Sequence, residues 1–117
     1  MPSKNSVVLI LWTCATLEEA RRICRELVEK KLIACANIIP HVESIYFWQE
    51  KVETGNESKV FLKTLESHFE LVKDYIKAHC SYEVPEVSQI CIDHGNPDYF
   101  RWVENEVGKE TSLKGQP

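Results

Sequence analysis

The sequence predicts an α+β domain in the order strand, helix, strand, strand, helix, strand, followed by one further helix. Three observations predict it. Short apolar, β-rich runs alternate with two longer segments in which apolar residues recur at helical spacing. A capping-box pattern, Ser or Thr followed three residues later by Glu, precedes each of those two segments. Asn96 and Pro97 then supply an N-cap and a first-turn proline for the last helix.

The first strand and the first helix come from residues 7–31. Residues 7–12 are apolar on both faces of a strand, which is typical of a buried central strand. Thr16 and Glu19 form the first capping box. The apolar residues that follow at helical spacing predict a helix over about residues 17–31.

A long hairpin is predicted next. Residues 32–39 are extended, and Pro40 must lie at a sheet edge or a bulge because it has no N–H to donate to a ladder. The second strand continues over residues 43–48, turns at residues 49–50 and returns over residues 51–53. The hairpin arm therefore carries three consecutive aromatic residues: Tyr46, Phe47 and Trp48.

The second half of the domain repeats the pattern of the first. After a break at Gly55 and Asn56, residues 58–64 predict the third strand. Ser67 and Glu70 form the second capping box, which opens a helix that ends near residue 79. Apolar and polar residues then alternate over residues 87–92, which predicts the fourth strand.

This order predicts a ferredoxin-like βαββαβ sandwich with an extended hairpin between its second and third strands. Right-handed crossovers place the first and third strands centrally and both longer helices on one face. An exposed aromatic hairpin favours aggregation of a monomer but makes a good subunit contact in an oligomer. We therefore expect Tyr46, Phe47 and Trp48 at an interface. The alternative is that these aromatic side chains pack on the core of their own protomer.

The chain is expected to be one domain over residues 6–107, between a flexible N-terminus (residues 1–5) and a disordered tail (residues 108–117). Its net charge of −4 and its scattered Lys and Arg residues give no nucleic-acid-binding face. The longest apolar run is too short for a membrane span, and the first residues lack a secretory signal pattern. We therefore expect a cytoplasmic protein.

The five cysteines fit neither a disulfide framework nor a zinc knuckle, because their number is odd and their spacing is irregular. Reduced thiols are therefore expected. Cys14 lies between the first strand and a helix N-terminus, a position that can lower the pKa of a thiol. The alternative is a buried and inert Cys14.

One short segment, residues 79–86, supplies imidazole, thiol and carboxylate groups for a metal ion. Its candidate ligands are His79, Cys80 and Glu86, and one rigid loop could aim the imidazole and the carboxylate at a common point in a subunit cleft. The alternatives are a solvated histidine and a salt-bridged surface glutamate.

No enzymatic motif accompanies these residues. The sequence has no Gly-rich phosphate loop, no nucleophile elbow and no His-Glu-x-x-His helix. A nucleophile pair of Cys14 and His79 would lack an identifiable orienting group and oxyanion hole. We therefore expect a protein that is not an enzyme.

Five segments, residues 32–40, 44–48, 62–64, 82–86 and 95–99, resemble CutA proteins in order and spacing. The resemblance implies a ferredoxin-like protomer in a tight homotrimer held by edge strands, with a role in divalent-cation tolerance and in copper binding. CutA proteins are also similar in architecture to the PII signalling trimers. The alternative function is therefore a signalling or scaffold trimer that binds a small molecule or a protein partner between subunits.

The resemblance also implies a set of copper ligands. In copper-binding relatives the ligands are similar to His79 and Glu86, joined by a cysteine at the position that this chain fills with Trp12. Cys14, which shares a strand face with Trp12, can substitute for that cysteine. Cys80 stands where a second histidine is often found, so the loop has gained a soft ligand. The expected metal is copper, which is not required for folding.

Overall fold

The computed structural model describes residues 6–108, and the expected flexible N-terminus (residues 1–5) and most of the expected tail (residues 109–117) lie outside the described residues. Gly108 is described, and its N–H donates to the carbonyl oxygen of Lys31 at 2.8 Å. The elements are β1 (Val7–Cys14), α1 (Leu17–Glu29), β2 (Cys35–Trp48), β3 (Lys51–Leu65), a 3₁₀ turn (Glu66–His68), α2 (Phe69–His79), β4 (Val87–Cys91) and α3 (Pro97–Glu106).

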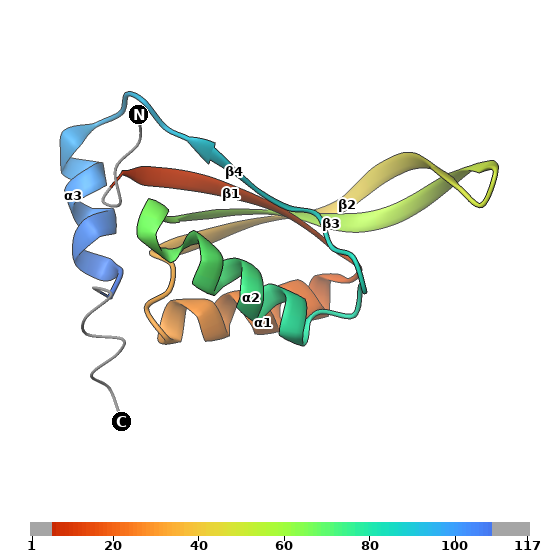
Figure 1. Ribbon diagram of the computed structural model, residues 1–117, viewed down its shortest axis with the longest axis horizontal. Helices are drawn as coiled ribbons and strands as arrows, with labels where there is room; N and C mark the ends of the chain where they lie inside the picture. Colours follow the sequence, from red (N-terminus) through yellow and green to blue (C-terminus); the bar gives the residue numbers. More distant parts are fainter. Residues whose placement is uncertain (1–5, 109–117) are drawn as a thin grey trace.

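The four strands form one antiparallel sheet in the order β2-β3-β1-β4. Helices α1 and α2 cover one face of this sheet, and α3 lies at the end away from the hairpin tip (Figure 1). The ferredoxin-like arrangement predicted from the element order is confirmed, with β1 and β3 in the centre. No helix among residues 6–108 is long and apolar enough to cross a bilayer.

The core lies between the sheet and the helices α1 and α2. Alternate residues of β1 point toward the helices and are buried, whereas the residues between them face the open side of the sheet. The residues that β1 and α1 contribute to this core are Val8, Ile10, Trp12, Cys14, Ala20, Ile23, Cys24 and Leu27. A second, smaller cluster attaches α3 to the end of the sheet through Val103 and Val107.

Two of the three predicted helix starts are confirmed. The side-chain oxygen of Thr16 accepts a hydrogen bond from the N–H of Glu19 at 3.2 Å, and that of Asn96 accepts one from Asp98 at 3.0 Å. The second capping box is wrong. Ser67 lies inside the 3₁₀ turn, and its hydroxyl lies 3.1 Å from Nδ1 of His68, so α2 begins without a side-chain cap.

The hairpin is longer and more regular than predicted. Gly55 and Asn56 do not break the strand, since they pair with Ser44 and Glu43 within a continuous β3. A glycine suits this position because a Cβ at Gly55 would lie 3.2 Å from the hydroxyl oxygen of Tyr46, whose side chain crosses it.

The bulge and the tight turn of the hairpin are where the sequence predicts them. The ladder shifts register between Ile39 and Val42, so the bulge at Pro40 is confirmed on the edge strand β2. The turn residues Gln49 and Glu50 both have positive φ, 48° and 64°, as a two-residue turn between twisted strands requires.

The aromatic side chains of the hairpin do not pack on the core of their own protomer. Tyr46, Phe47 and Trp48 are 46%, 71% and 61% exposed. Beyond the bulge the two strands extend past the rest of the sheet as a separate arm (Figure 1). The alternative of an internal aromatic cluster is therefore wrong.

Candidate metal centre

His79 is the last residue of α2, and its side chain is exposed. Its Nδ1 lies 2.8 Å from the carbonyl oxygen of Tyr75, one helical turn earlier, and its ring stacks on the Tyr75 ring with centroids 4.0 Å apart. A carbonyl oxygen can only accept, so this contact assigns the ring proton to Nδ1. The lone pair of Nε2, which has no partner among the described residues, is then available to a cation.

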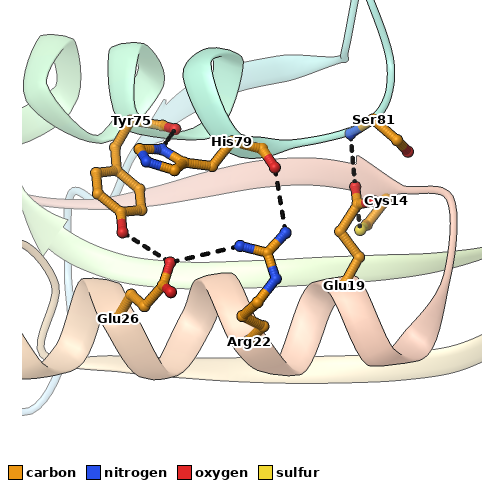
Figure 2. Close-up of polar contacts among 7 residues, drawn as sticks. All are labelled: Cys14, Glu19, Arg22, Glu26, Tyr75, His79 and Ser81. Carbon is orange, nitrogen blue, oxygen red and sulfur yellow. Dashed lines mark hydrogen bonds and ion pairs between the residues drawn. The ribbon is translucent and has the colours of Figure 1, made fainter.

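Helix α1 contacts this end of α2 through a line of polar side chains (Figure 2). The guanidinium of Arg22 donates to the carbonyl oxygen of His79 at 3.2 Å and lies 3.7 Å from the carboxylate of Glu26. The hydroxyl of Tyr75 donates to the same Glu26 oxygen at 2.7 Å. The backbone and the ring support of His79 are therefore both attached to α1.

Cys14 is the last residue of β1 and lies on the buried face of that strand. Its thiol donates to Oε2 of Glu19 and to the carbonyl oxygen of Thr16, both at 3.4 Å, and Oε2 of Glu19 also accepts from the N–H of Ser81 at 3.0 Å (Figure 2). Burial raises the pKa of the Cys14 thiol to about 12. The thiol is the donor in both contacts, and Cys14 is buried, as the second of the two alternatives expects.

Cys80 is half-buried against the core. Its thiol donates to the carbonyl oxygen of Tyr82 at 3.4 Å, and burial raises its pKa as well. Thiolate, the form that binds metals, is disfavoured at both Cys14 and Cys80.

Glu86 lies at the entrance of β4, on the open face of the sheet. One of its carboxylate oxygens accepts from the ammonium of Lys59 at 2.7 Å and from the hydroxyl of Thr13 at 2.6 Å. These two bonds hold the pKa of Glu86 below its usual range. The carboxylate is therefore negatively charged near neutral pH, but it is already paired with the ammonium group of Lys59.

A cavity of about 960 Å³ surrounds Glu86 on this open face. Its lining residues come from β1, β2, β3 and the loop that precedes β4. It is lined by Thr13, Val42, Ser44, Tyr46, Trp48, Glu57, Lys59, Tyr82, Glu83, Val84 and Glu86.

Within one chain His79 and Glu86 share no polar partner among residues 6–108. The partners of His79 belong to α1 and α2, whereas those of Glu86 belong to β1 and β3. Among residues 6–108, no three His, Cys, Asp or Glu side chains converge in a way that could hold a metal ion. The loop of residues 79–86 thus presents its imidazole and its carboxylate to different neighbours.

Several residues of these sites are absent from the sequence-based candidates. Tyr75 precedes His79 by four positions on a helix, and Arg22 precedes Glu26 by four, a spacing that places side chains side by side. That signal was available in the sequence. No local pattern, by contrast, could pair Lys59 with Glu86, because their contact depends on the order of the strands.

Residues 8–106 match the protein family described as CutA1 divalent ion tolerance protein. The chain belongs to this CutA1 family. It is 42% identical over 95 residues to the CutA homolog of Xenopus laevis, covering 81% of this chain and 63% of that one. It is 39% identical over 95 residues to the divalent-cation tolerance protein CutA of Archaeoglobus fulgidus, covering 81% and 92%.

Solved CutA1 structures share the fold of this CutA1 chain. The crystal structure of CutA1 from Oryza sativa matches with a TM-score of 0.88 at 33% identity, covering 90% of this chain and 96% of that one. The chain spans 56% of the length of the chloroplastic rice relative and 62% of the mouse relative. The family is named for divalent-ion tolerance and not for a reaction.

Proposed function

We propose that the protein binds divalent cations as a homotrimer, copper before zinc, and that His79 is the main ligand in each chain. The observation that carries this proposal is the 2.8 Å contact from Nδ1 of His79 to the carbonyl oxygen of Tyr75, which leaves the lone pair on Nε2 of an exposed imidazole. Metal-binding histidines commonly donate their other nitrogen in this way. The general affinity order of divalent metals favours copper at nitrogen and oxygen ligands.

The remaining candidate ligands fit less well within one chain. The ammonium of Lys59 competes with any cation for Glu86, so Glu86 contributes only where the metal displaces Lys59. Cys14 and Cys80 remain protonated thiols, since burial raises both pKa values. The ligands that complete the coordination of copper are therefore expected from a neighbouring subunit or from water.

The homotrimer is supported by the exposed hairpin. Tyr46, Phe47 and Trp48 lie on a projecting arm whose strand β2 is an edge of the sheet. Large exposed aromatic side chains on such an arm are typical of a subunit interface. Light scattering at micromolar concentration should give three times the chain mass of 13.6 kDa, and a monomer mass would contradict the proposal.

Calorimetric titration of divalent copper tests the metal site. His79→Ala should weaken copper binding by at least about tenfold, and Glu86→Ala should weaken it less because Lys59 already occupies that carboxylate. His94→Ala is the matched control, since His94 is also exposed and lies outside this region. Equal affinity in all variants would show that neither His79 nor Glu86 is a ligand.

The open-face cavity supports a second candidate function, a signalling or scaffold trimer that binds a small molecule or a protein partner. A volume of about 960 Å³, aromatic side chains in the lining and an ion pair between Lys59 and Glu86 are features of small-molecule sites. Under this function, a metabolite raises the melting temperature and copper does not.

A cytoplasmic location stays part of the proposal. The solved CutA of Archaeoglobus fulgidus is described as periplasmic, so relatives of this chain are not confined to one compartment. Fractionation of cells that express the protein tests the location directly.

A further inference from the structure

The imidazole of His79 lies on a support that is itself fixed to another helix. Its ring stacks on Tyr75 at an interplanar angle of 22°, and the hydroxyl of Tyr75 donates to Glu26 of α1 (Figure 2). The same residue thus provides the carbonyl oxygen for Nδ1 of His79 and the surface on which the ring rests.

We propose that Tyr75, held by Glu26 and Arg22 of α1, is a positioning residue that sets the tautomer and the orientation of the His79 ring for metal binding. The metal part rests on the proposed function of His79. The tautomer part concerns the metal-free protein and can be tested without a metal.

The first step concerns the side chain of Tyr75. Every residue type at position 75 has a backbone carbonyl oxygen, so the carbonyl alone does not explain why Nδ1 points to it. An exposed histidine at a helix end has several rotamers. The stacked phenol ring favours the rotamer in which Nδ1 reaches the carbonyl oxygen, because the ring contact at 4.0 Å is made in that rotamer.

The second step concerns what holds Tyr75. Its hydroxyl lies 2.7 Å from Oε1 of Glu26, and the guanidinium of Arg22 lies 3.7 Å from the same oxygen. The phenol hydroxyl is the donor in this hydrogen bond, which ties the Tyr75 ring to α1. The ammonium of Lys30 lies 5.8 Å from the centroid of the Tyr75 ring and adds a further contact from the end of α1.

The third step concerns the backbone. The last carbonyl oxygens of a helix have no partner within that helix. Arg22 donates to the carbonyl oxygen of His79 at 3.2 Å, and Glu19 accepts from the N–H of Ser81 at 3.0 Å. Helix α1 therefore holds the main chain at His79 and just after it, as well as the ring support of His79. A ligand that is fixed before the metal arrives loses less conformational entropy on binding.

The test reads the tautomer of His79 by long-range ¹⁵N–¹H NMR in metal-free protein at about pH 8, where histidine side chains in proteins are mostly neutral. The wild type should show the Nδ1–H tautomer. Tyr75→Leu should show a mixture of the two tautomers and bind copper about 10-fold to 100-fold more weakly. Tyr75→Phe keeps the ring and should restore most of the Nδ1–H population.

The matched control is Tyr99→Leu. Tyr99 also stacks on a neighbouring ring, that of Trp102 with centroids 5.7 Å apart, but it lies on α3 and does not contact His79. This variant should leave both the tautomer and the copper affinity unchanged. Should Tyr75→Leu fail to fold, Glu26→Ala tests the same support from the half-buried side chain on α1, with a tautomer mixture expected.

The outcomes separate the two proposals. An Nε2–H tautomer in the wild type, or an unchanged Nδ1–H tautomer in folded Tyr75→Leu, overturns the positioning role of Tyr75. A tautomer that responds to Tyr75 as expected in a protein that binds no copper supports the positioning role and removes the metal function. A weaker copper affinity with an unchanged tautomer also overturns the positioning role, since Tyr75 would then act by another route.

Discussion

The ammonium of Lys59 and the carboxylate of Glu86 lie 2.7 Å apart and share the hydroxyl of Thr13 between them. Lys59 donates to the hydroxyl oxygen at 3.0 Å, and the hydroxyl donates to the carboxylate at 2.6 Å. Thr13 belongs to β1, Lys59 belongs to β3, and Glu86 directly precedes β4. This polar cluster therefore joins three neighbouring chain segments on the open face of the sheet.

This cluster predicts a pH dependence of stability. The bonds from Lys59 and Thr13 lower the pKa of Glu86 in the folded state. A lowered pKa stabilises the folded state above the pKa of the unfolded chain, near 4.5, and this stabilisation is lost as the pH falls through the folded value. The side chain of Glu86 is 48% exposed, so water screens the pair and its contribution is about 1 kcal/mol or less.

Glu86→Gln should therefore reduce the free energy of unfolding by that amount at pH 7 and have little effect at about pH 3. Denaturant unfolding at both pH values checks the difference. Glu83→Gln, in the same loop, is the control, and an equal loss at both pH values in Glu86→Gln would contradict the ion-pair origin.

A second prediction concerns the hairpin. If Trp48 is buried between subunits, Trp48→Ala should cost about 3 to 5 kcal/mol per interface and lower both the melting temperature and the trimer mass. Trp102→Ala on α3 removes a comparable ring that is 42% exposed, and the trimer should persist in it. An unchanged melting temperature in Trp48→Ala would place Trp48 on the surface of the assembled protein.

A third prediction concerns the thiols. Cys14 is 1% exposed, and burial raises its pKa from the usual 9.0 to about 12, so near neutral pH its thiolate population is far below that of an exposed thiol. Brief alkylation of the native protein, read by mass spectrometry, should label Cys80 and leave Cys14 and Cys24 unmodified. Alkylation in denaturant should label all five cysteines.

The same reagent separates the metal ligands. Native protein alkylated at its accessible thiols should bind copper as the untreated protein does if His79 is the main ligand. Loss of copper binding on alkylation, together with only a weak effect of His79→Ala, would show that a cysteine is the main copper ligand.

A fourth prediction concerns the hairpin turn. Gln49 and Glu50 both adopt positive φ, which costs roughly 1 kcal/mol in an ordinary residue and nothing in glycine. Glu50→Gly removes this cost and should raise stability in thermal unfolding by less than about 1 kcal/mol, because the greater freedom of glycine in the unfolded chain offsets part of the gain. Glu53→Gly, in the paired part of the same hairpin, should lower it, and a loss in both variants would contradict this account of the turn.

The sequence was sufficient for the element order because periodicity and end signals are local properties. The caps at Thr16 and Asn96 and the bulge at Pro40 each follow from one residue and its near neighbours. The two errors have tertiary causes. Gly55 suggests a turn from the sequence alone, but it lies within β3 against the Tyr46 side chain. Ser67 suggests an N-cap, but it lies inside a 3₁₀ turn.

The candidate site was predictable to a smaller extent. Residue types selected His79, Cys80 and Glu86 as candidate ligands, but a shared loop does not decide which neighbours each side chain meets. Lys59 reaches Glu86 only because β3 and β4 both flank β1. The burial of Cys14 likewise depends on α1 lying over β1, which raises the pKa that its position before a helix would lower.

The arm beyond the bulge has a further consequence. Ile45, Phe47 and Val52 are 68%, 71% and 71% exposed, and a two-stranded ribbon alone is marginally stable in water. Its amide hydrogens should therefore exchange with solvent quickly in a dilute, dissociated chain and slowly once another chain covers it. Order in this part of the molecule then becomes a function of protein concentration, and dilution alone would unfold the arm while the central sheet stays intact.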